Sequence, residues 1–138
     1  MAVTYSFAVL DAKNDALETA IGTAPLLRMY DGTPPTNART ALSSNTLLAE
    51  GALPSDWLGA SSSGVKSKAG TWTITGQTGA STGTAATFYR IYDSSGTTCH
   101  EQGTVGESGA DMLIDTNLIA DGQTVTVTAY AKTSGNIG

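Results

Sequence analysis

Short runs of alternating apolar and polar residues constrain the fold of this chain more than any other feature. In "GTWTITG" (residues 70–76) Trp72 and Ile74 alternate with threonines, and in "TVTVTAY" (residues 124–130) Val125 and Val127 do the same. Alternation with a period of two residues is typical of antiparallel strands with one buried face. About seven such strands, separated by turn residues, predict a mainly β fold: an antiparallel β-sandwich or a jelly-roll-like barrel.

The first segment of the chain has the period of a helix instead. Apolar residues recur there at spacings of three, four and seven, although Asn14 interrupts the stripe. Thr4 or Ser6 can cap the start of a helix, and Gly22 suits its end. We expect one amphipathic helix from about Tyr5 to Ile21 that packs its stripe on the sheet or on a sister subunit. The stripe consists of Val3, Phe7, Leu10, Leu17 and Ile21.

The length of 138 residues predicts a single domain. We divide it into a helical segment (residues 1–24), a β-sandwich (residues 25–133) and a tail (residues 134–138). Charged residues make up only 14% of the chain and the net charge is −5, which disfavours a nucleic-acid-binding protein because such proteins need a clustered basic face. No apolar run approaches the roughly 20 residues that a membrane-spanning helix needs, and the first residues lack the pattern of a signal peptide.

The stretch "FYRIYDSSGTTCHEQ" (residues 88–102) contains the single cysteine and the single histidine of the chain side by side. "DSSG" suits a type I turn with a glycine bulge, which would make this stretch a hairpin in which Ile91 faces Cys99 and Arg90 faces His100. Adjacent strand residues point to opposite faces. We therefore expect Cys99 inside and His100 on the other face near Arg90, too far apart to act as a nucleophile–base pair.

Other catalytic and metal-binding patterns are also missing from the sequence. Asp111, Asp115 and Asp121 have no calcium-loop spacing, and their positions beside turns suit backbone hydrogen bonds. The Gly-rich stretch 103–111 lacks the Lys-Ser/Thr ending of a phosphate-binding loop, and the chain has no GxSxG motif. We therefore expect no enzymatic activity, no catalytic residue, no metal and no cofactor.

Two groups of residues suggest contacts with a protein partner. The excursion from Pro54 to Gly70 is too long for a simple strand connection. It offers Trp57 and Leu58 as an apolar anchor and Lys66 and Lys68 as positive charges in an acidic chain, although Trp57 could equally fill one end of the sandwich. On the strand 88–92, Arg90 and Tyr92 share a face, and these residue types are enriched in protein interfaces.

The order of segments resembles small structural proteins of tailed bacteriophages and prophages. The helix, "LLRMYDGTPP", "TLLAEGAL", "ATFYRIYDSSGT", "GTVGESGADMLID" and "ADGQTVTVTAYA" carry the resemblance over nearly the whole chain. The family includes head decoration (cement) proteins. It implies a non-enzymatic β-sandwich that binds and stabilises the major capsid protein lattice on the virion surface after assembly in the host cytoplasm. It also implies self-association as a dimer or trimer.

Two other functions stay open from the sequence. A tail-associated structural subunit would also be a β-rich assembling protein. A carbohydrate-binding sandwich would present aromatic side chains on an exposed face, and Trp57 and Trp72 are the candidates for stacking on a sugar.

Overall fold

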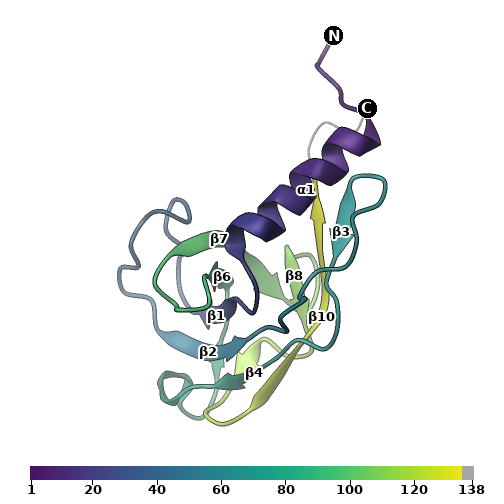
Figure 1. Ribbon diagram of the computed structural model, residues 1–138. Coiled ribbons are helices and arrows are strands. Elements are labelled where there is room, and N and C mark those ends of the chain that lie inside the picture. The colour runs from purple at the N-terminus through teal and green to yellow at the C-terminus, as the bar shows by residue number, and fades with distance from the viewer. Residues whose placement is uncertain (135–138) are drawn as a thin grey trace.

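One sheet closes on itself to form a barrel of seven strands, with a single helix beside it (Figure 1). This computed structural model describes residues 1–134. The tail proposed for residues 134–138 therefore lies outside the described residues apart from Ser134. The elements are α1 (Phe7–Ile21), β1 (Leu26–Tyr30), β2 (Leu47–Ala52), β3 (Val65–Ser67), β4 (Thr73–Gly76), the 3₁₀ turn η1 (Thr78–Ala80), β5 (Thr84–Ala85), β6 (Phe88–Tyr92), β7 (Cys99–Gly106), β8 (Met112–Ile114), β9 (Leu118–Ile119) and β10 (Thr124–Thr133).

The order around the barrel is β10-β4-β2-β1-β6-β7-β8, and β8 pairs with β10 again to close it. The prediction of a mainly β fold with one N-terminal helix is confirmed, and the sheet forms a barrel rather than an open sandwich. The neighbours are antiparallel except β7 and β8, which run parallel. The turn between them is held by Asp111, whose Oδ2 accepts hydrogen bonds from the Thr104 backbone N–H (2.9 Å) and hydroxyl (3.0 Å).

Strand β10 belongs to the barrel over its first part and extends beyond it over its last part. Residues 124–126 pair with β4 and residues 127–130 pair with β8. Residues 131–133 instead pair with β3, the short strand of the Pro54–Gly70 excursion. In Figure 1 the end of β10 and β3 lie beside α1, so this extension is the platform on which the helix packs.

The barrel interior contains a row of aromatic rings. The rings of Trp57 and Trp72 lie 5.8 Å apart, and those of Trp72 and Tyr130 lie 5.1 Å apart. Each indole N–H has a partner, because Trp57 donates to the Gly22 carbonyl (2.9 Å) and Trp72 donates to the Ala69 carbonyl (3.0 Å). Buried indoles of this kind stabilise a core through their area while their polar atom stays satisfied.

The helix has the predicted caps but a shorter buried stripe. Ser6 caps its start by accepting a hydrogen bond from the Val9 N–H (3.4 Å), and Gly22 ends it with a φ of 94°. Leu10 and Ile21 are buried, whereas Phe7 is 52% exposed. Of the two predicted alternatives for Phe7, packing on the sheet is wrong, because the first turn of α1 extends past the barrel (Figure 1), and packing on a sister subunit stays a prediction.

The hairpin β6–β7 has the predicted turn but a different register. The Gly96 N–H donates to the Asp93 carbonyl (2.9 Å) and Gly96 has a φ of 73°. Tyr92 pairs with Cys99 and Ile91 pairs with Glu101, so His100 is the extra residue of a bulge. The predicted pairs Ile91–Cys99 and Arg90–His100 are therefore wrong. Glu101 is buried, whereas Cys99 is half-buried beside Arg90 and Tyr92 in a surface pocket, and His100 is exposed.

The close approach of β4 to the turn before β10 gives a test of this packing. A Cβ on Gly76 would lie 1.9 Å from the Ala120 carbonyl oxygen, whereas a Cβ on Gly59 would meet its nearest neighbour at an ordinary 3.6 Å. We expect Gly76→Ala to lower the free energy of unfolding by about 3 kcal/mol and Gly59→Ala to lower it by less than about 1 kcal/mol, as measured by urea denaturation. Equal losses in the two variants would contradict the register described here.

Candidate interaction surface

The structure places most of the predicted partner-binding residues inside the chain. In the Pro54–Gly70 excursion, Trp57, Leu58 and Lys66 are buried between α1 and the end of the barrel. Of the four residues predicted there, only Lys68 is partly exposed. Trp57 therefore fills one end of the barrel, which is the alternative that the sequence left open. Arg90 and Tyr92 are buried as well. Trp57, Leu58 and Lys66 are therefore unavailable to a partner unless the fold opens, and the sequence prediction for these three is corrected. Arg90 and Tyr92 are accessible only where they line a surface pocket.

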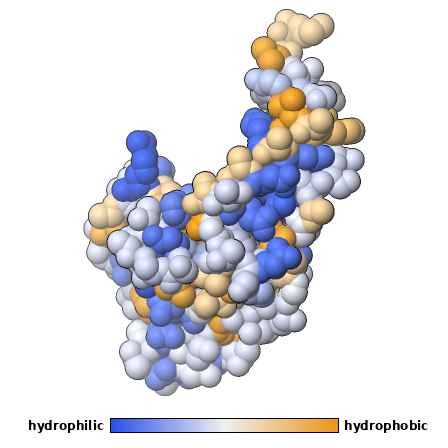
Figure 2. All heavy atoms as spheres, viewed as in Figure 1, coloured by the Kyte–Doolittle hydropathy of each residue, from blue (hydrophilic) through white to orange (hydrophobic). Residues whose placement is uncertain are grey.

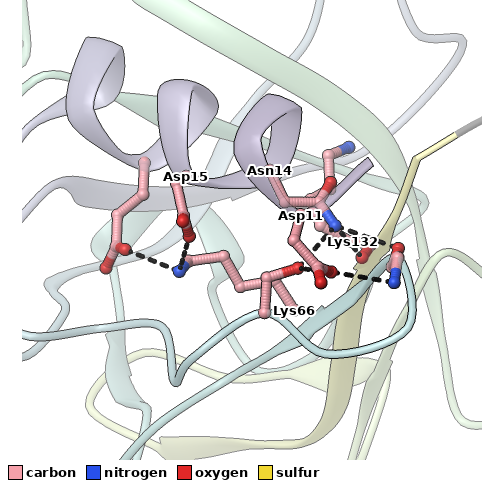
Figure 3. A network of polar contacts seen from close by, with 8 residues as sticks. Asp11, Asn14, Asp15, Lys66 and Lys132 are labelled. Carbon is pink, nitrogen blue, oxygen red and sulfur yellow. Dashed lines mark hydrogen bonds and ion pairs between the residues drawn. The ribbon is translucent and has the colours of Figure 1, made fainter. Parts of the chain in front are cut away.

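Lys66 is buried because it joins β3 to the helix (Figure 3). Its Nζ lies 2.8 Å from Asp15 Oδ1 and 3.0 Å from Glu18 Oε1, one turn apart on α1. Burial lowers the pKa of Lys66, but the hydrogen bonds and negative charges of Asp15 and Glu18 outweigh it and raise the pKa above its ordinary value. The lysine is thus held charged between two carboxylates, and its role is to dock the helix.

Asn14, which interrupts the apolar stripe of the helix, is a second docking contact. Its side-chain amide donates to the Gly64 carbonyl (2.9 Å) and to the Ser61 hydroxyl (3.1 Å), and Asp11 accepts from Ser61 and from the Gly64 N–H (Figure 3). The polar face of α1 therefore recognises the 61–64 turn. From the sequence, Asn14 is only an interruption of the apolar stripe, because nothing in the local pattern reveals a turn about fifty positions away.

Arg90 and Tyr92 lie on the outside of the barrel but beneath the long segment 31–46. The hydroxyl oxygens of Tyr92 and Tyr30 lie 3.3 Å apart, and the Tyr30 ring stacks on Phe88 at 5.3 Å. Arg28 lies over the Tyr92 ring at 4.6 Å and pairs with Glu50. The 31–46 segment thus covers a second, outer aromatic layer, separate from the barrel core.

Glu101 is buried at the end of the barrel nearest α1. Its Oε2 accepts hydrogen bonds from the hydroxyls of Tyr89 (2.6 Å) and Tyr130 (2.7 Å). Its Oε1 accepts no hydrogen bond among residues 1–134 but lies 3.1 Å from Lys132 Nζ, so its charge is paired. Burial raises the pKa of both tyrosines, and the neighbouring negative charge of Glu101 raises it further. This cluster closes the barrel end, with all of its charged members paired.

An apolar surface that the sequence analysis missed lies at the start of the chain. Residues 1–134 have seven exposed large hydrophobic side chains, and five of the seven lie in residues 1–9. In Figure 2 this segment, which we call the arm, projects from the body with hydrophobic residues interspersed among paler, more polar ones. The five exposed hydrophobic residues of the arm are Met1, Val3, Tyr5, Phe7 and Val9.

The arm changes its period where the helix begins. Val3, Tyr5 and Phe7 alternate with small or polar residues, and Ser6 has an extended backbone (φ −67°, ψ 158°). This alternation by itself indicates an extended segment, but Val3 and Phe7 also fit the helical spacing, which places them in the predicted helical stripe. Exposed contiguous apolar surface of this kind marks interaction sites in folded proteins.

Metal and membrane sites are not found in the described part of the chain. Residues 1–134 contain no cluster of three or more His, Cys, Asp or Glu side chains that could hold a metal ion. In the same residues no helix has the length and hydropathy to cross a bilayer. No protein-family model, curated protein or solved structure matches the chain.

The docking role of Lys66 predicts different outcomes for the two lysines of the excursion. Lys66→Glu places a third carboxylate beside Asp15 and Glu18 in a buried position, and we expect it to lower the free energy of unfolding by about 3–5 kcal/mol. Lys68→Glu removes only an exposed hydrogen bond to the Gly70 carbonyl and should cost less than about 1 kcal/mol. Urea denaturation measures both, and a stable Lys66→Glu variant would contradict the docking role.

The buried tyrosines predict how stability changes at alkaline pH. Burial raises the pKa of Tyr30, Tyr89 and Tyr130 above the ordinary value of 10.0, so the folded chain keeps protons that the unfolded chain loses. Stability is therefore fully present below about pH 10 and falls as the pH rises above it. In an ultraviolet titration these three tyrosines should ionise only as the chain unfolds. Titration of all five tyrosines near pH 10 in the folded protein would contradict their burial.

Proposed function

We propose that this chain is a non-enzymatic structural protein that binds the major capsid protein of a phage head through the arm. The observation that carries the proposal is the concentration of exposed apolar side chains in residues 1–9. Burying each large side chain of this kind at a partner contributes about 1.5–3 kcal/mol before the costs of association. The arm is therefore the segment of the chain with the most to gain from a partner.

The closed barrel supports an assembly role for the arm. Within the barrel each strand has a neighbour on both sides, so a partner sheet cannot add there. The extended, alternating arm has the pattern of a strand that can pair with a sheet of another protein. A rigid body with one projecting apolar arm suits a protein that sits on a shell and reaches into a neighbouring subunit.

The place on a phage head rests on the resemblance of the strand phrases to head decoration proteins. A decoration protein stabilises a shell because each weak contact repeats over a symmetric lattice, so one arm of moderate affinity is sufficient. Self-association as a dimer or trimer would multiply the arms at each lattice position in the same way.

The two alternative functions fare differently against the side-chain positions. The carbohydrate-binding alternative needs an exposed aromatic platform, yet Trp57 and Trp72 have no exposed surface. The tail-associated alternative uses the same arm and barrel, so it differs only in the partner. Binding to separated heads and tails distinguishes these two places in the particle.

The test is binding of an arm variant to heads isolated from the virus that carries the chain. We expect the double variant Val3→Ser, Phe7→Ser to bind at least about tenfold more weakly in cosedimentation, because two apolar side chains are lost from the interface. Its melting temperature should stay close to that of the parent, since both side chains are exposed in the free chain.

Leu118→Ser is the matched control, because Leu118 is 58% exposed on β9, outside the arm. Its affinity for heads should equal that of the parent. Equal binding by the arm variant and the control would contradict the role of the arm. Binding of the parent to tails and not to heads would replace the head assignment with the tail assignment.

A further inference from the structure

Arg90 is a buried cation without a carboxylate partner. It is only 3% exposed, and the four ion pairs within residues 1–134 involve Arg28, Lys66 and Lys132 instead. Lys66 shows how this fold treats its other buried cation, since two carboxylates contact it. A buried charge costs several kcal/mol unless it is paired. The missing anion at Arg90 therefore requires an explanation.

The protein contacts of Arg90 are all neutral and use only part of the guanidinium group. Nε donates to Gln102 Oε1 (2.9 Å), and Nη2 donates to the carbonyl of Thr40 (2.6 Å) and more weakly to that of Asn37 (3.4 Å). These bonds fix the position of the guanidinium group beneath the 31–46 segment. Nη1 has no hydrogen-bond partner within the described residues, so its N–H groups remain available.

Arg90 lines a surface pocket of about 490 Å³ between the 38–42 segment and the end of the β6–β7 hairpin. Arg39 lies at the same pocket, is exposed, and forms no ion pair within residues 1–134. Tyr92, Thr97 and Thr98 add hydroxyl groups to the lining. The lining contains two arginines and no Asp or Glu, in a chain with a net charge of −5.

We propose that this pocket binds an oxyanion group, a carboxylate or a phosphate, with Arg90 Nη1 and Arg39 as its charged donors. Hydrogen bonds between arginine and an oxyanion are charge-assisted and roughly twice as strong as neutral ones. Two sources can supply such a group: the acidic side chain of a neighbouring protein, or a free small anion. The inference does not depend on the proposed function, because it concerns the isolated chain and a site outside the arm.

Cys99 provides a reporter for the pocket. It is the single cysteine of the chain, it is half-buried, and it lines the same pocket as the two arginines. Burial raises the pKa of the Cys99 thiol, while the positive charge of Arg90 acts in the opposite direction. An anion bound at Arg90 therefore both covers the thiol and reduces its thiolate fraction, and the two effects slow alkylation in the same direction.

The experiment follows alkylation of Cys99 by N-ethylmaleimide, a neutral reagent, in the full chain at constant ionic strength. Chloride is replaced stepwise by inorganic phosphate or by N-acetylglutamate amide, which carries one side-chain carboxylate. We expect saturable protection that slows alkylation at least about fivefold. Tighter protection by the glutamate derivative assigns the site to an acidic side chain, and tighter protection by phosphate assigns it to a free anion.

Two variants test whether the protection of Cys99 depends on anion binding in this pocket. Arg39→Gln should raise the anion concentration for half-protection about tenfold, because it removes one charged donor from an exposed position without disturbing the fold. Lys68→Gln removes the same charge outside the pocket and should leave half-protection unchanged. The absence of saturable protection by both anions, or equal shifts in the two variants, would overturn the proposal.

Discussion

Closure of the sheet by β10 is the constraint on which the rest of the structure depends. The strand pairs with β4 on one side and β8 on the other, and its last residues continue outward to pair with β3. That outward extension carries the Lys132 ion pair with Glu101, and its neighbour β3 carries Lys66. The helix docks on Lys66, on the Lys132 carbonyl and on the 61–64 turn. Without β10 the barrel would lose its closure and the helix its platform.

The charged residues at the barrel end near the helix form ion pairs within the chain, so few of them remain free to bind a partner. Lys66 pairs with Asp15 and Glu18, and Glu101 pairs with Lys132, so these charges are neutralised within the chain. Trp57 fills the barrel end beneath the helix. The surfaces left for binding are the arm, which is apolar and projects from the body, and the Arg90 pocket, which is cationic and lies beneath the 31–46 segment. They differ in chemistry and position, so each can have its own ligand.

Local patterns in the sequence predict the elements well and their environments less well. The alternation around Trp72 and Val125 predicts both the strands and the buried faces, and Ser6 and Gly22 predict the ends of the helix. Ile91 pairs with Glu101, two residues beyond the predicted Cys99; the bulge at His100 accounts for one of these two residues, and no local rule requires it. Lys66 is buried because of carboxylates about fifty residues away, and Arg90 is buried because a distant segment covers it. Long-range packing decides these positions.

We expect the arm to bind the partner while the barrel stays rigid. Hydrogen–deuterium exchange of the chain, free and bound to phage heads, tests this claim directly. In the free chain, amides of residues 1–4 should exchange rapidly, since they precede the helix and form no regular structure, while those of β4, β8 and β10 should be protected. Binding should protect the arm and leave the barrel unchanged. New protection confined to residues 54–70 or to the barrel strands, with none in the arm, would contradict the claim.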